Sequence, residues 1–182
     1  DLRTMAILHR IGAVLTLLYF TLHISQLIYQ LKNKHITLKK MFWGRDSLTP
    51  QLHDAKDFIQ HIGYFLGMAK KPQFGKWAYW EKFDYLAVFW GVAIIGVSGL
   101  TLWFPEFFTN ILPGWAINAA HIIHSEEALL ATGFIFTIHF FNEHLRPENF
   151  PFDEVIFTGS MSEHYLTEER GKWYEQLKEE GK

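Results

Sequence analysis

The feature that most limits how this chain can fold is an apolar stretch without any charge at residues 85–104, YLAVFWGVAIIGVSGLTLWF. At a rise of about 1.5 Å per residue, a helix of this length matches a hydrocarbon core of about 30 Å. Residues 5–31 contain one charged side chain, Arg10. Residues 115–144 have a third helical pattern, which ends at Arg146-Pro147 because proline cannot continue a helix. The sequence therefore predicts an all-α fold, a transmembrane helical bundle with three spanning helices.

The segments between these helices predict how the chain is oriented. The loop at residues 32–79 has nine Lys or Arg against three Asp, so by the positive-inside rule it is cytoplasmic and the turn at 105–114 lies outside, as does the N-terminus. Within the loop, Thr49-Pro50 predicts the cap and first residue of an amphipathic helix on the membrane surface. We expect residues 1–147 to form the transmembrane bundle and residues 148–182 a cytoplasmic tail with a surface helix at 163–178. Because the chain opens with Asp1 and not with Met, we expect sequence upstream, with room for a fourth helix.

Composition excludes several classes of function. The chain has no cysteine, which rules out disulfides, thiolate metal sites and covalent c-type haem, and leaves histidine for metal ligation. A net charge of -2 argues against a nucleic-acid partner. The first apolar stretch is too long for a signal peptide. No nucleophile with an attendant base and no phosphate loop is found, so the chain is not expected to catalyse a reaction alone.

Four histidines have matched spacings in the first and last predicted spans. His9 and His23 are fourteen residues apart and His124 and His139 fifteen apart, which corresponds to roughly 21 and 22 Å along a helix. Three crossings make these two helices parallel, so His9 would face His124 and His23 would face His139. Two histidines can ligate one haem iron and leave no open position, as suits electron transfer. We therefore predict two haem b groups.

Other residues complete this predicted site. Gly12 and Gly133 leave room for a porphyrin edge beside the helices, although small residues also serve helix packing. Arg10 is placed to pair with a haem propionate at the outer face. His121 competes with His124 as a ligand, but its distance from His139 matches the first helix poorly. The remaining histidines fall in cytoplasmic segments and are expected to be solvated or interfacial: His35, His53, His61, His144 and His164.

Two alternatives from other functional classes remain open. One is a non-redox membrane anchor in which the histidines are structural. The other is a metal-ion transporter whose conduction path uses His124, Glu126 and Glu127. An optical difference spectrum distinguishes them, because b-type bands require haem.

Four segments resemble the membrane cytochrome b family that includes the gamma subunits of formate dehydrogenases and the cytochrome b of nickel-iron hydrogenases. They are HSEEALLATGFIFTIH, GKWAYWEKFDYLAVFW, VSGLTLWFP and EHYLTEERGKWYEQL, and the similarity runs from Ala6 to Leu177. The resemblance implies a four-helix, dihaem subunit of a respiratory complex in the bacterial cytoplasmic membrane. Such a subunit carries electrons between a cytochrome c, iron-sulfur or catalytic subunit and menaquinone or ubiquinone. It also implies that His124 and His139 each ligate one haem and that His9 is a further ligand.

The chain departs from this family pattern at two places. The family's first helix, which holds a ligand for the inner haem, has no counterpart, so His23 is proposed from spacing alone. In the quinone-side stretch at residues 78–82, only Lys82 matches cleanly, so a quinone site is not predicted at the level of residues. The spacing also resembles the cytochrome b of bc-type complexes, by ligand pattern only.

Overall fold

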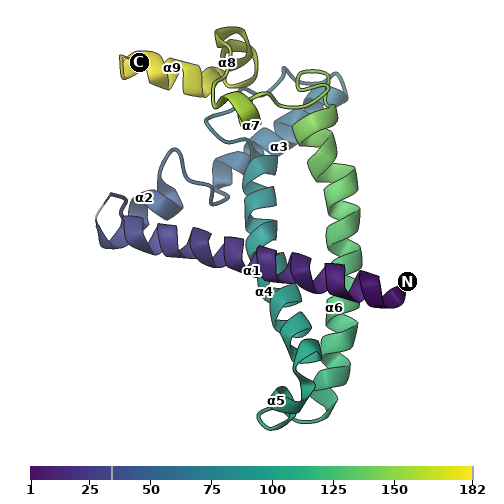
Figure 1. Cartoon of the computed structure of the whole chain (residues 1–182). Helices are drawn as coiled ribbons and strands as arrows, with labels where there is room; N and C mark the ends of the chain where they lie inside the picture. The colour runs from purple at the N-terminus through teal and green to yellow at the C-terminus, as the bar shows by residue number, and fades with distance from the viewer. Residues whose placement is uncertain (34, 182) are drawn as a thin grey trace. The chain divides into compact units, whose positions relative to one another are not determined.

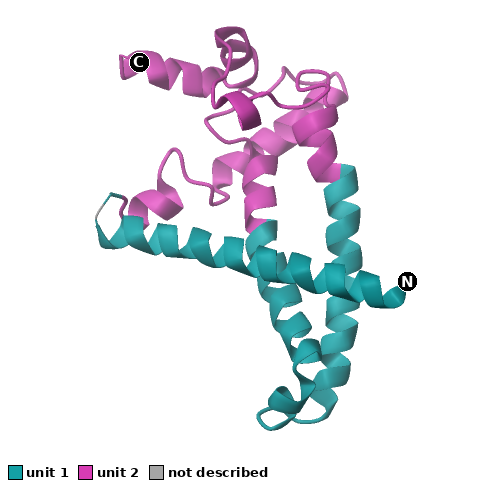
Figure 2. Ribbon diagram, in the orientation of Figure 1, with its two compact units in different colours: residues 1–35, 87–137 teal, residues 36–86, 138–182 magenta. Residues whose placement is uncertain are grey.

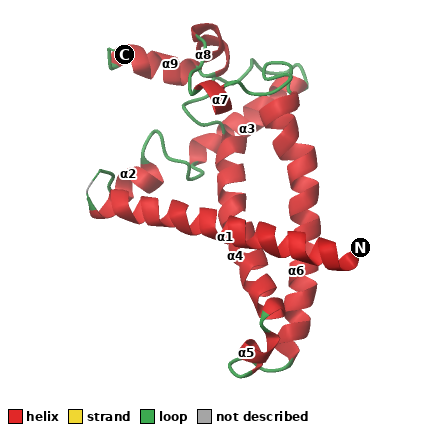
Figure 3. Cartoon of the chain, in the orientation of Figure 1, coloured by secondary structure: helices red, strands yellow, loops and turns green. Residues whose placement is uncertain are grey.

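The computed structural model describes residues 1–33 and 35–181, and this described part is helical without strands, which confirms the all-α prediction (Figure 3). The chain divides into two compact units (Figure 2). Unit 1 comprises residues 1–35 and 87–137, and unit 2 comprises residues 36–86 and 138–182. The predicted domain boundary at residue 147 stays a prediction.

Unit 1 is built from long apolar helices (Figure 1). They are α1 (Leu2–Lys32), the greater part of α4 (Tyr79–Trp103) and α6 (Trp115–Phe134), with the short α5 (Pro105–Thr109) in the predicted outer turn. Among the described residues, two helices, α1 and α4, are long and apolar enough to cross a membrane. The third predicted span is not one of them. Polar side chains lower the apolarity of α6: Asn118, His121, His124, Ser125, Glu126 and Glu127.

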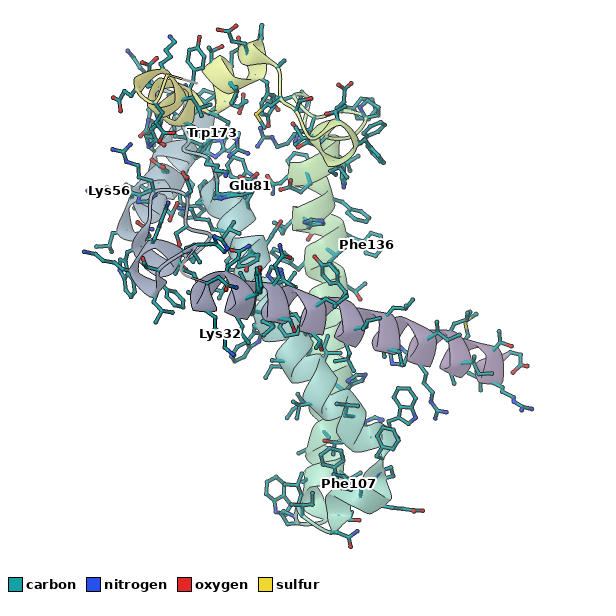
Figure 4. All side chains as sticks on the ribbon, turned by 60° about the vertical axis from the view of Figure 1, so that its left-hand side comes forward. Lys32, Lys56, Glu81, Phe107, Phe136 and Trp173 are labelled. Atoms are coloured by element: carbon teal, nitrogen blue, oxygen red, sulfur yellow. The ribbon has the colours of Figure 1, made fainter. Side chains whose placement is uncertain are left out.

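Within unit 1, α1 crosses α4 and α6 and does not run alongside them (Figures 1 and 4). Phe20 packs on Phe89 with ring centroids 5.2 Å apart, and a Cβ added at Gly96 would lie 3.5 Å from Leu17. The prediction that the first and last helices are parallel is therefore wrong. Apolar residues surround α1 on all sides, so no single stripe selects a parallel packing.

The last long helix changes its winding after Phe134. Residues Ile135–His139 and Phe141–Leu145 are π-helical, and the helix ends at Arg146, which is extended before Pro147. The predicted end is thus confirmed, since the residue before proline disfavours the helical conformation. A π-turn holds more residues than an α-turn, so the regular α-helical spacing expected between His124 and His139 does not hold through residues 135–139.

Unit 2 contains the short helices of the loop and the tail. They are α2 (Leu38–Trp43), α3 (Leu52–Phe65), α7 (Val155–Thr158), α8 (Glu163–Glu169) and α9 (Gly171–Glu179). Two predicted details are wrong. The cap of α3 is Gln51, in a capping box with Asp54, and not Thr49. The single tail helix is two helices, because the backbone at Arg170 leaves the helical region.

In unit 2, ion pairs join the loop helix α3 and the tail to the first turns of α4, beside a small core of Phe74, Ala78 and Trp80. Lys82, a residue that is 1% exposed, donates from its ammonium to both oxygens of Asp54, at 2.8 and 2.9 Å. A second pair is bidentate, with Arg170 donating twice to Glu81 at 2.7 Å. Burial lowers the pKa of Arg170, but the Glu81 carboxylate more than offsets this and the pKa lies above its ordinary value.

Glu81 also fixes where α4 begins. Its Oε2 accepts a hydrogen bond from the backbone N–H of Ala78, the residue before the helix, at 2.6 Å. This is one half of a capping box, and it satisfies a donor that the helix itself leaves unpaired. The first turn of α4 is thereby tied to the tail through Arg170.

Candidate haem-ligand site

The ring of His124 lies against α4, where the side chains are small. A Cβ added at Gly99 would come within 2.9 Å of Cε1 of this ring, closer than real contacts allow, and within 3.3 Å of Nδ1, which is a tight contact. Only glycine at this position lets the imidazole reach the backbone of α4. The glycine at position 99 thus makes room for a histidine ring.

Hydrogen bonds from α4 define which ring nitrogen of His124 bears the proton. Nδ1 lies 3.1 Å from the Ile95 carbonyl oxygen, which can only accept. The Ser98 hydroxyl is 3.1 Å from the same nitrogen and donates its own proton to the Ile94 carbonyl at 2.7 Å, so it too accepts from the ring. Nδ1 therefore carries the proton, and Nε2 keeps a lone pair for a metal.

His9 on α1 faces this ring. The two ring centroids are 5.9 Å apart and the planes are nearly perpendicular, at 83°. Two imidazoles that bind one metal from opposite sides, with bonds of about 2 Å, have centroids roughly 6 Å apart. Edge-to-face ring contacts fall in the same range. The distance thus fits axial ligation, and the tautomer of His124 favours it.

His139 has the same arrangement with a stronger acceptor. Its Nδ1 lies 2.9 Å from Oδ2 of Asp84, near the start of α4, and the carboxylate side chain is 15% exposed. An ionised carboxylate only accepts, so Nδ1 donates and Nε2 is again the nitrogen left for a metal. The two histidines of the last helix are therefore held in the same tautomer by acceptors on α4.

Unpaired polar atoms surround His139 in unit 2. The His144 ring lies 6.3 Å from it between centroids, and Nδ1 of His144 is buried without a hydrogen-bond partner. Oε1 of Glu143 and Oδ1 of Asp84 are likewise buried and unpartnered. His144 as a whole is half-buried, so the expectation that it is solvated or interfacial stays a prediction.

His23 contacts Phe89, with ring centroids 5.8 Å apart, and is half-buried. It belongs to unit 1, whereas His139 belongs to unit 2. The pairing of His23 with His139 therefore stays a prediction.

Open space surrounds the two glycines that were predicted to lie beside a porphyrin. A Cβ added at Gly12 or at Gly133 would meet no atom within 4 Å. This fits a flat ligand edge at either position. Arg10, expected to pair with a propionate, lies 5.3 Å from the centre of the Trp103 ring and is exposed.

Comparison with known proteins neither adds to nor removes from this description. No family model, curated protein or solved structure matches the chain. The resemblance to membrane cytochromes b therefore rests on the sequence segments alone.

The other histidines have local partners or face solvent. His121 is exposed, and His61 lies 3.1 Å from the Tyr79 hydroxyl. Burial lowers the pKa of His61, and the cations Arg146 and Lys71 lower it further. Across residues 1–33 and 35–181, no three His, Asp or Glu side chains gather where they could hold a metal ion, so the transporter alternative lacks such a cluster.

Sequence reasoning missed the residues that orient the ligands. Asp84 and Ser98 bond directly to Nδ1 of the two histidines, yet neither was singled out. One signal was available, since Asp84 directly precedes the charge-free stretch at residues 85–104, where a carboxylate is costly unless paired.

Proposed function

We propose that this chain is a dihaem b-type cytochrome subunit that carries electrons across a membrane. The observation that supports this best is the shared tautomer of His124 and His139. Each is fixed by an acceptor on α4 and keeps Nε2 available. Histidines that serve only as structural links would not need the same nitrogen left unused at both levels.

The first haem would be held between His9 and His124, and the second by His139 with His23 as its expected partner. Haem iron supplies the one-electron redox chemistry when it is bound. The chain's own residues would ligate the iron and orient the imidazoles. The Ile95 carbonyl and the Asp84 carboxylate keep the ring protons on Nδ1, so that neither ring can turn its protonated nitrogen toward a metal.

Exposure of the long helices supports a location in the membrane. The most apolar windows of α1 and α4 are 0% and 11% buried, whereas the core helix of a soluble protein would be mostly covered. In the π-helical segment Ile135–His139 that follows α6, Phe136 projects outward and is 64% exposed (Figure 4). Lipid would cover such surfaces at no cost in free energy.

The loop helix α3 supports a position of the loop at the membrane surface. Its inner face holds the buried carboxylates Asp54 and Asp57, while apolar side chains point outward, among them Ile59 and Phe65 at 68% and 73% exposed. A helix with its apolar face outward suits a membrane surface. With the basic loop inside, the chain would be a multi-pass protein of the bacterial cytoplasmic membrane.

The proposed partners follow from the resemblance to membrane cytochromes b. They are a cytochrome c, iron-sulfur or catalytic subunit on one side and menaquinone or ubiquinone in the membrane. The chain itself would not catalyse a reaction.

Haem counting tests the proposal directly. Protein loaded with haem in detergent should show b-type bands in a reduced-minus-oxidised spectrum and bind two haems. His9→Ala and His124→Ala should each remove the same haem, and the double variant should lose no more than either one. His139→Ala should remove the other haem. His164→Ala, in the exposed tail, should retain both.

Two results would contradict the proposal. Protein without b-type bands after loading would leave the anchor or the transporter. Retention of both haems in His124→Ala and His139→Ala would show that other residues are the ligands.

A further inference from the structure

The two histidines of the last helix differ in the charge of the group that accepts a hydrogen bond from their Nδ1–H. Nδ1 of His124 donates to a carbonyl and a hydroxyl, both neutral. Nδ1 of His139 donates to the Asp84 carboxylate at 2.9 Å. Both predicted ligands are histidines on the same helix, but one has neutral hydrogen-bond acceptors and the other has a charged acceptor.

Asp84 is placed so that its charge acts on His139. The carboxylate is 15% exposed, and its second oxygen, Oδ1, is buried without a hydrogen-bond partner. Little of the negative charge is therefore spread over other donors or screened by water. In the described part of the chain, the Asp84 carboxylate accepts its side-chain hydrogen bond from His139.

A carboxylate behind a ligating imidazole makes the ring more basic. The second-shell partner of a histidine orients the ring and tunes the metal, and a basic ligand favours the more highly charged ferric state over the ferrous state. The carbonyl and hydroxyl behind His124 orient that ring without adding a full charge.

We propose that Asp84 is a positioning residue that lowers the midpoint potential of the haem ligated by His139 relative to what a neutral partner would give. This inference rests on the proposed dihaem function. The two haems would then differ in midpoint potential because His139 has a charged acceptor and His124 has neutral ones. Bound haems would exchange one electron, so that one iron would be oxidised as the other is reduced, with no bond or proton change in the chain.

Redox titration of the haem-loaded protein tests this. The absorbance lost in His139→Ala identifies the haem concerned, and the titration then follows that haem in Asp84→Asn. At a fixed potential near its midpoint we expect the ratio of reduced to oxidised haem to rise roughly tenfold, which for one electron is about 59 mV. The haem at His124 should keep its potential, which also shows that the variant is folded. Asp46→Asn, the same change at an exposed loop residue, should alter neither haem.

The outcomes separate the inference from the function. Two haems with both potentials unchanged in Asp84→Asn would overturn the inference and leave the dihaem function standing. Absence of haem from the unmutated chain would overturn the function itself. If Asp84→Asn loses one haem, Asp84→Glu decides: recovery of that haem at a potential near that of the unmutated chain supports the inference, and failure to recover it overturns the inference.

Discussion

At the scale of single residues, the site depends on small side chains of α4 as much as on the histidines. Gly99 and Ser98 are neighbours: Gly99 makes room for the His124 ring, and the Ser98 hydroxyl accepts a hydrogen bond from its Nδ1–H. The Asp84 carboxylate accepts the corresponding hydrogen bond from His139. The helix that provides no ligand thus determines which ring nitrogen each ligand can offer.

Gly99→Ala should disturb the haem between His9 and His124. The added Cβ would lie 2.9 Å from Cε1 of His124, so the ring must move and lose its bonds to α4. We expect the variant to bind one haem, or to bind the first haem at least tenfold more weakly, as loss of second-shell partners typically does. Haem titration followed by absorbance measures this.

Gly75→Ala is the matched control, since a Cβ there meets no atom within 4 Å. It should bind both haems normally. Normal binding of both haems by Gly99→Ala would mean that His124 does not need its place against α4.

The histidines could be predicted from the sequence because their spacing is a local property of helices. Their orienting partners could not, because Asp84 and His139 are fifty-five residues apart and meet only through packing. The same holds for Ser98 and His124. The environment of His144 also depends on the π-helical turns, which no residue pattern indicated.

At the scale of elements, helix existence was predictable and helix ends were not. The span at residues 5–31 is observed as Leu2–Lys32, because a long apolar run has few alternatives. The start of α3 was misplaced because Gln51 and Asp54 form a capping box that competes with the Thr49-Pro50 signal. The tail helix breaks at Arg170, where a buried bidentate pair with Glu81 takes precedence over continuous winding.

The Lys82–Asp54 pair should stabilise the junction of α3 and α4. Asp54→Asn keeps the cap of α3 but leaves the buried Lys82 ammonium without its counter-charge. Breaking a buried ion pair costs about 3–5 kcal/mol. We expect the free energy of local opening of α3, measured by hydrogen exchange in micelles, to fall by about 3 kcal/mol.

Glu175→Gln makes the same chemical change in an exposed pair with Lys178. It should lower the free energy of opening by less than about 0.5 kcal/mol. Equal effects of the two variants would show that the Lys82–Asp54 pair contributes no more than an exposed pair.

At the scale of the whole molecule, each unit joins segments that are distant in sequence. Both α4 and the last helix contribute residues to the two units, so Ser98 and His124 lie in unit 1 while Asp84 and His139 lie in unit 2. Three membrane spans predicted that α1 and the last helix run parallel. This prediction failed because α1 lies across its neighbouring helices in unit 1 (Figure 1). Counting spans predicts the direction of a helix but not its tilt, which depends on packing.

Single-cysteine labelling should show which segments lie in the membrane, because the chain has no cysteine of its own. In sealed vesicles, a membrane-impermeant maleimide should label Lys39→Cys from the cytoplasmic side and Thr109→Cys from the outer side. Val97→Cys, on the exposed apolar surface of α4, should not react from either side, since the reagent does not enter hydrocarbon and the thiol stays protonated there. After denaturation in detergent, all three variants should label equally. Reaction of Val97→Cys in sealed vesicles, or labelling of the other two from one side, would refute a membrane span by α4, because in either case the charge-free stretch would not separate two aqueous compartments.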